Sequence, residues 1–283
     1  MIRIISDSTC DLSPELLERY DVTILPLHIL MGEKEYEDGI GITPDEIYAW
    51  SDQTGQVPKT SAPSIDSAIK VMKPYLDQGD ELICFCISES MSTSGNVMRL
   101  TAEELDAEDR VTVINSKNLS TGIGLLIVEA AIMAKEGKTA EEIRTRIEDL
   151  IPEVRTSFVV DTMVYLHRGG RCGSVAALAG SALKLHPEII VEDGAMHVGK
   201  KFRGKMDKVI EKYAGSLKDD LLSAKKDRVF VTHSGCSEEL VSKIKGYVEE
   251  LQVFDEVLVT RAGGVISTHC GPGTLGVLFI ADE

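Results

Sequence analysis

The sequence predicts an α/β protein with two domains, and two observations carry this prediction. Short apolar runs alternate with helical stretches along the whole chain, which is the pattern of βαβ units on a parallel or mixed sheet. With 283 residues, the chain is long enough for two ordinary domains that each bury a core. We therefore expect a mainly parallel sheet with helices on both faces, followed by a domain that is built on a mixed sheet with helices.

The first half of the chain supplies the parallel sheet. Its apolar runs predict strands at residues 2–6, 22–30, 82–87 and 111–114. Helices between them begin at hydroxyl residues that Pro, Ala or acids follow, namely Ser13, Thr43 and Thr139. Two consecutive helices are expected at 121–135 and 139–150. A domain boundary near residue 155 follows, which divides the chain into residues 1–155 and 156–283.

The second half mixes parallel and antiparallel features. Apolar runs at 188–191 and 196–202 flank a turn at 192–195, which predicts a β-hairpin. A glycine-rich turn is expected at 169–173, before a helix at 174–183. The remaining expected elements are strands at 156–160, 229–232, 257–261 and 275–280 and helices at 205–222 and 238–251.

The charge balance excludes two classes of partner. The chain has 30 Lys and Arg residues against 46 Asp and Glu residues, which gives a formal net charge of −16. Such a field opposes phosphate backbones and anionic lipid surfaces, so we expect no nucleic acid partner. Charges interrupt the apolar stretches before they reach the ~18 residues of a membrane span, and we expect no stable membrane insertion.

Cysteine usage and the N-terminus indicate a cytoplasmic protein. Met1 leads directly into an apolar run, without the basic and apolar leader of an exported protein. Scattered cysteines are typical of reduced thiols in the cytosol. They are Cys10, Cys84, Cys86, Cys172, Cys236 and Cys270. Metal binding at Cys84 and Cys86, or at His233 and Cys236, is an alternative, but no Cys-x-x-Cys pair accompanies them, and we expect no metal.

Four stretches contain more Gly, Ser, Thr and His than packing requires, at residues 7–11, 60–64, 88–95 and 267–273. The first follows the first strand, where α/β sheets place ligands, although a hydrogen-bonded turn explains it equally well. The second ends in Ser64, which caps a helix whose N-terminus would suit an anion. The third follows a buried strand and could offer several neutral donors to one anion. The fourth places His269 in a loop whose glycines let it approach a ligand closely.

Common catalytic motifs are missing from the sequence or occur out of context. Residues 271–276 match G-x-G-x-x-G, but an apolar strand follows in place of a helix, so the match is accidental. We find no phosphate-binding loop, nucleophile elbow or H-E-x-x-H zinc motif. The Ser, Thr and His residues therefore look like hydrogen-bond donors rather than reactants, and we expect a protein that is not an enzyme.

Taken together, these clusters resemble the DegV family of bacterial fatty-acid-binding proteins. Five elements match in the same order along the whole chain. They are residues 6–9 (Ser-Asp-Ser-Thr), 60–64, 88–95, 166–171 (Leu-His-Arg-Gly-Gly-Arg) and 269–276. Each element is short, but five in register make a specific signal.

The resemblance implies a lipid carrier without a cofactor. A long-chain fatty acid such as palmitate would lie in a tunnel between the two domains, with its carboxylate bound by hydroxyls and a histidine. Carried over by motif, these residues are Thr60, Ser61, Ser92, Thr93 and His269. The family delivers the acid to a separate fatty acid kinase. Arg171 is a candidate for docking that kinase, although a helix-opening turn explains its segment at least as well.

The chain departs from the family pattern in two places. Ser90 and Thr93 stand where the loop at 88–95 usually has glycine, with Glu89 beside them. Which hydroxyl of this loop makes the shortest contact therefore stays open. Ala62 replaces the usual glutamine, so that side chain can have no role here.

The energetics are compatible with lipid binding. Burying about 14 to 18 acyl carbons at roughly 0.8 kcal/mol per methylene gives a gross gain on the order of 10 kcal/mol. A buried carboxylate needs hydrogen bonds, and we expect uncharged donors, with no Lys or Arg on the carboxylate. The alternative is an acyl hydrolase or acyltransferase in the same cleft, with His269 as base and a Ser as nucleophile.

Overall fold

A computed structural model describes residues 1–171 and 185–282, and its strands form three sheets. The first sheet is entirely parallel and has the order β2-β1-β6-β7. Its strands are β1 (Ile2–Asp7), β2 (Val22–Leu25), β6 (Glu81–Cys86) and β7 (Val111–Asn115). A small antiparallel sheet has the order β4-β3-β5. Its strands are β3 (His28–Met31), β4 (Lys34–Glu37) and β5 (Lys59–Ser61).

The third sheet is mixed and has the order β10-β9-β8-β13-β11-β12. Only β11 and β12 pair in parallel; the other neighbours are antiparallel. The strands are β8 (Val154–Val159), β9 (Leu185–Glu192), β10 (Ala195–Arg203), β11 (Ala224–Ser234), β12 (Glu256–Arg261) and β13 (Thr274–Ala281). The predicted α/β class, with a parallel N-terminal sheet and a mixed C-terminal sheet, is therefore confirmed.

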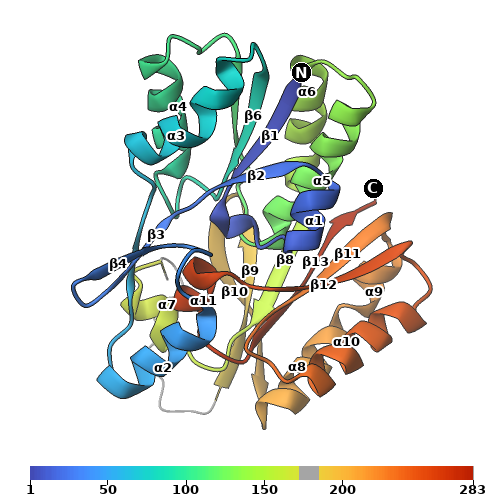
Figure 1. Cartoon of the computed structure of the whole chain (residues 1–283). Helices are drawn as coiled ribbons and strands as arrows, with labels where there is room; N and C mark the ends of the chain where they lie inside the picture. Colours follow the sequence, from blue (N-terminus) through green and yellow to red (C-terminus); the bar gives the residue numbers. More distant parts are fainter. Residues whose placement is uncertain (172–184, 283) are drawn as a thin grey trace.

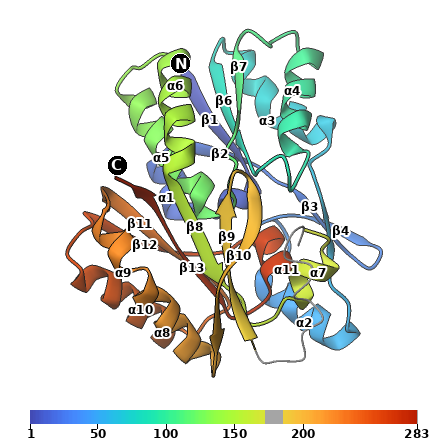
Figure 2. The ribbon, with the colours of Figure 1, turned by 180° about the vertical axis from the view of Figure 1, so that it is seen from behind.

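Helices cover both faces of the parallel sheet, as Figure 1 and the reverse view in Figure 2 show. On one face lie α3 (Ile65–Leu76) and α4 (Ser94–Glu104), and on the other α5 (Thr121–Lys135) and α6 (Ala140–Leu150). The outer face of the mixed sheet packs on α8 (Met206–Ser216), α9 (Lys218–Leu222) and α10 (Glu238–Glu250). The remaining helices are η1 (Ser8–Cys10), α1 (Pro14–Arg19), α2 (Pro44–Thr54), η2 (Ile151–Glu153), α7 (Val164–Arg168) and α11 (Gly264–Cys270).

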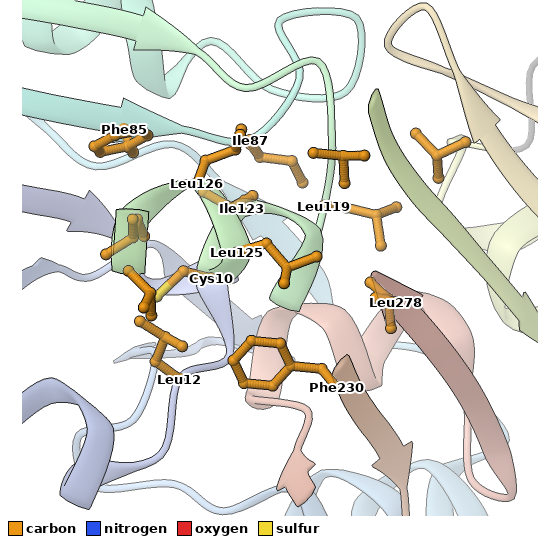
Figure 3. Close-up of a cluster of buried hydrophobic side chains, with 14 of the residues drawn as sticks. Cys10, Leu12, Phe85, Ile87, Leu119, Ile123, Leu125, Leu126, Phe230 and Leu278 are labelled. Atoms are coloured by element: carbon orange, nitrogen blue, oxygen red, sulfur yellow. The ribbon is translucent and has the colours of Figure 1, made fainter. Parts of the chain in front are cut away.

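The two large sheets share one hydrophobic core, in which α5 is the central element. This helix packs against β1 and β6 on one side and against β8, β11 and β13 on the other. Figure 3 shows Leu125 and Leu126 of α5 among Phe85 of the parallel sheet and Phe230 and Leu278 of the mixed sheet. A helix that is apolar all round is buried on every side, because each face needs a partner. The division at residue 155 stays a prediction.

Two elements that were predicted to be continuous are each divided in two in the structure. The expected strand at 22–30 is split into β2 and β3, which belong to different sheets. Pro26 lies between them, and proline has no N–H to continue a strand ladder. The expected helix at 205–222 is likewise two helices, α8 and α9, which meet at Leu217. The expected helix at 174–183, and the end of the turn at 169–173, lie outside the described residues.

Candidate ligand-binding site

Three of the four polar clusters meet in one pocket, which lies between β5, α11 and the loop of residues 88–95, here called the serine loop. Its polar lining residues are Thr60, Ser61, Ser92, Arg171 and His269. The rest of the wall is mainly apolar and includes Leu27, Leu166, Met196 and Val265. A few polar groups on a mainly apolar wall are typical of sites for small molecules.

Thr60 and His269 are in direct contact, although 209 residues separate them in sequence. Thr60 lies on β5, opposite Ile29 of β3. His269 lies in the last turn of α11, and its Nε2 is 2.8 Å from Thr60 Oγ1. The small antiparallel sheet and α11 thus join two of the predicted site residues in one hydrogen bond.

The environment of His269 keeps its imidazole neutral at physiological pH. Burial and, to a smaller degree, the positive charge of Arg171 lower its pKa from 6.5 to about 4. Its Nδ1 is buried and has no hydrogen-bond partner among the described residues. Gly169 packs so closely on this nitrogen that a Cβ there would collide with it. The ring is therefore fixed in place by packing on one side and by Thr60 on the other.

The expectation that His269 lies in a loop is wrong, because residues 264–270 form the short helix α11. Gly263, in an extended conformation, precedes the helix, and Gly271, with a φ of 76°, ends it. Glycine commonly ends helices because it adopts positive φ at little cost. Gly271, one of the two glycines that suggested a loop around His269, is thus the stop signal of a helix.

Most hydroxyls of the serine loop have structural partners. Ser88 Oγ donates to the carbonyl of Gly194 at 2.6 Å, and Ser90 Oγ donates to the same carbonyl. Ser94 Oγ donates to Asp7 Oδ2 at 2.6 Å. Ser92 lines the pocket, whereas Thr93 is exposed and precedes α4 without making a side-chain cap.

Arg171, the candidate for docking a partner, lines the same pocket as His269. Its Nη1 donates to the carbonyl of Gly169 at 2.8 Å, and its Nε donates to the carbonyl of Met91 at 3.4 Å. The guanidinium therefore connects the segment after α7 to the serine loop. It also brings one cation to a cluster that we expected to be uncharged.

The cluster at residues 7–11 does not line the pocket. Asp7 accepts hydrogen bonds from Thr9 and Ser94 and from the backbone N–H of Ile87. Asp11 accepts from Ser120. Of the two interpretations left open for this cluster, the geometry favours the hydrogen-bonded turn. Sequence reasoning missed Asp38 and Gly194, whose contacts involve residues far apart in the chain.

A second, mainly apolar pocket adjoins the first. The two have volumes of ≈ 40 and ≈ 30 Å³ and share Leu119, Ile266 and Cys270 as walls. Figure 3 shows Leu119 near Leu278, which lines the second pocket. That the two pockets belong to one tunnel long enough for an acyl chain stays a prediction.

Two further searches cover only the residues that the structure describes. Within 1–171 and 185–282, no group of three or more His, Cys, Asp or Glu side chains could hold a metal ion. Across the same residues, no helix combines the length and apolar character needed to cross a membrane.

The protein is thus an α/β protein with three sheets, and its pocket has a mainly apolar wall with a few polar groups. A family model described as "Uncharacterised protein, DegV family" matches residues 1–282. The chain belongs to the DegV family, which confirms the resemblance seen in the sequence. A DegV domain-containing protein of Clostridium perfringens is 31% identical over 284 residues, which cover 99% of each chain.

Solved structures of relatives agree with this assignment. A DegV family protein from Thermus thermophilus, described with fatty acid binding, has a TM-score of 0.90 and 30% identity, with 99% of each chain covered. A stearic acid-binding protein from Eubacterium ventriosum has a TM-score of 0.85 and 32% identity, covering 99% of this chain and 98% of the other. DegV of Bacillus subtilis, a fatty acid binding protein, has a TM-score of 0.86 and 25% identity, with 99% of each chain covered.

Proposed function

We propose that this protein binds one long-chain fatty acid, such as palmitate, by its carboxylate and presents it to a fatty acid kinase. The single observation that carries the proposal is the contact between Thr60 and His269 in a mainly apolar pocket that Ser92 also lines. Relatives described as fatty acid binding share the fold over nearly the whole chain. In this proposal the carboxylate lies among Thr60, Ser61, Ser92 and His269.

The protonation of His269 supports a donor role for Thr60. Because Nδ1 is buried without a partner, the neutral ring is best satisfied with its proton on Nε2, facing Thr60. Nε2–H then donates to Thr60 Oγ1, and the hydroxyl hydrogen of Thr60 is free to donate to a carboxylate. Thr93 was proposed with these residues, but its exposure and its absence from the pocket wall make it the weakest member of the set.

Arg171 has two roles in this proposal. Its position in the pocket puts a positive charge near the bound carboxylate, which favours the ionised form of the acid. Its side chain is half-exposed, so it can also contact the kinase that phosphorylates the bound acid. An Arg171→Ala protein that keeps its bound lipid but gives acyl phosphate more slowly in the presence of the kinase and ATP would support the docking role.

The alternative of an acyl hydrolase or acyltransferase has less support. A general base works best with a pKa near the operating pH, whereas the pKa of His269 is lowered to about 4. Its Nε2 contacts Thr60 rather than a serine, and no carboxylate among the described residues orients Nδ1. A serine nucleophile would therefore lack the activated base that such catalysis needs.

Mass spectrometry of the purified protein tests the proposal directly. The expected result is one fatty acid per chain, and delipidated protein should take up palmitate stoichiometrically in a calorimetric titration. Protein that carries no lipid and takes up none would contradict lipid binding. Repeated turnover of an acyl ester, abolished in His269→Ala, would favour the enzyme instead.

A further inference from the structure

Three buried carboxylates are not among the residues that line the pocket and have no place in the proposed function. Asp7, Asp11 and Asp38 have exposed fractions of 0%, 5% and 4%. No ion pair joins any of them to a cation within the described ranges. Their oxygens accept instead from hydroxyls and backbone N–H groups, so these carboxylates are occupied and are not a cation site.

Asp38 holds the beginning of the helix that carries His269. Its Oδ1 accepts from the backbone N–H groups of Gly264 and Val265, at 2.7 and 3.3 Å. The first N–H groups of a helix have no partner within the helix, so a buried start requires an acceptor from elsewhere. Asp11 adds a third such contact, because its Oδ1 accepts from Gly263 N at 2.8 Å.

The other side of Asp38 is attached to the small antiparallel sheet. Asp38 directly follows β4, and its backbone N–H donates to the carbonyl of Leu27, just before β3, at 2.8 Å. Its Oδ2 accepts from Ser8 Oγ at 2.8 Å, and Ser8 Oγ in turn accepts from Leu27 N. Thr60 lies on β5 of the same sheet. One carboxylate therefore connects the sheet that carries Thr60 to the helix that carries His269.

We propose that Asp38 is a positioning residue of the site, which sets His269 against Thr60 by holding the start of α11 on the small sheet. This inference rests on the proposed function only for its effect on fatty acid affinity. Its effect on His269 is a property of the protein without ligand. A seven-residue helix has little stability of its own, so its position depends on contacts of this kind.

The test uses the full-length protein and three variants. Asp38→Leu keeps the branched shape of the side chain and removes the acceptor, whereas Asp38→Asn keeps an acceptor oxygen for Gly264 and Val265. Asp80→Leu is the matched control, because Asp80 is also a buried carboxylate but pairs with Arg3 and the N-terminus. The measurements are the ¹⁵N NMR titration of His269, assigned with His269→Gln, and the affinity for palmitate.

In Asp38→Leu, His269 should titrate nearer its ordinary value, and palmitate affinity should fall roughly tenfold because buried donors have lost their acceptor. Asp38→Asn should restore both, and Asp80→Leu should change neither. A wild-type titration and affinity in Asp38→Leu would overturn the proposal. If Asp38→Leu does not fold, the smaller Asp38→Ala, which also removes the acceptor, takes its place: a His269 titration nearer its ordinary value would support the proposal, and a wild-type titration would overturn it.

The measurements distinguish a failure of the proposed lipid binding from a failure of the proposed role of Asp38. If the wild-type protein binds no fatty acid while Asp38→Leu still changes the His269 titration, lipid binding fails and the positioning role stands. If the wild-type protein binds palmitate and Asp38→Leu behaves like wild type, the positioning role fails and lipid binding stands.

Discussion

The two sides of the pocket use their hydroxyl groups differently. On one side, His269 is the only side chain among the described residues to which the Thr60 side chain is hydrogen-bonded. Both residues line the pocket. On the other side, the serine loop is rich in hydroxyls, yet Ser88, Ser90 and Ser94 donate to acceptors within the protein. The first side consists of one hydrogen-bonded pair, Thr60 and His269. On the second side, most hydroxyls hold the protein together and Ser92 lines the pocket.

This difference shows that the number of hydroxyls in a loop overstates the donors that a ligand finds. Ser90 stands where the family usually has glycine, and its hydroxyl adds a second hydrogen bond to the carbonyl of Gly194. Gly194 belongs to the turn between β9 and β10 of the mixed sheet, so this contact joins the serine loop to the other large sheet. The loop therefore helps to hold the protein together as well as to form the site.

Removing the hydroxyl of Thr60 should give the largest loss of affinity. Thr60→Val keeps the shape but leaves His269 Nε2 and the carboxylate without this partner. We expect palmitate to bind roughly tenfold to a hundredfold more weakly, because hydrogen bonds to charged groups are the strong ones. Calorimetric titration measures the effect, with the exposed Thr54→Val as control. Unchanged affinity in Thr60→Val would show that the hydrogen-bonded pair of Thr60 and His269 does not bind the carboxylate.

Ser94→Ala should affect stability more than binding. The change leaves the buried Asp7 without one of its donors, so the free energy of unfolding should fall by about 1–3 kcal/mol. Urea denaturation measures this effect, and the affinity for palmitate should change much less than in Thr60→Val. Wild-type stability combined with a large loss of affinity would mean that Ser94, rather than Ser92, serves the ligand.

Ser92→Ala should show the opposite behaviour at a smaller magnitude. Ser92 lines the pocket, and its loss should weaken palmitate binding roughly fivefold to tenfold, less than the loss of the Thr60 hydroxyl, because Thr60→Val also leaves His269 Nε2 without its partner. The urea midpoint should stay close to that of the wild type. If Ser92→Ala and Ser94→Ala change the palmitate affinity and the urea midpoint equally, the two serines do not differ in role, and the loop has no separate donors for the ligand and for the fold.

A further expected effect is on the pH dependence of stability. The pKa of His269 is about 4 in the folded protein and 6.5 when unperturbed, so the unfolded state binds more protons between these values. Stability from the neutral ring is fully present above pH 6.5 and is lost as the pH falls toward 4. Between pH 7 and 5, the Tm of His269→Gln should therefore fall less than that of the wild type. Equal slopes would indicate an ordinary pKa for His269.

Local signals predicted most elements of the fold correctly. The capping residues Ser13, Thr43 and Thr139 each accept a hydrogen bond at the start of the predicted helix. The hairpin around residues 192–195 also forms, as β9 and β10. These features depend on neighbours within a few residues. The split at Pro26 could have been predicted from the missing N–H, but that its two halves join different sheets could not.

The site was predicted in part. Thr60, Ser61, Ser92, Arg171 and His269 lie around one pocket, whereas Thr93 does not line it. Whether these residues bind a carboxylate stays a prediction. The sequence offered no signal for Asp38, because one aspartate in a charged chain is not distinguishable from a solvated one.

By itself, the sequence determined the α/β class, the main helices and strands, and the family, because these follow from local patterns and from motifs in order. Only the tertiary structure decided which hydroxyls face the pocket and which hold the chain together. It also decided that Asp38 contacts α11 and that Thr60 contacts His269. Such contacts join residues that are far apart in the chain, and their geometry depends on how the sheets and helices pack rather than on any local preference.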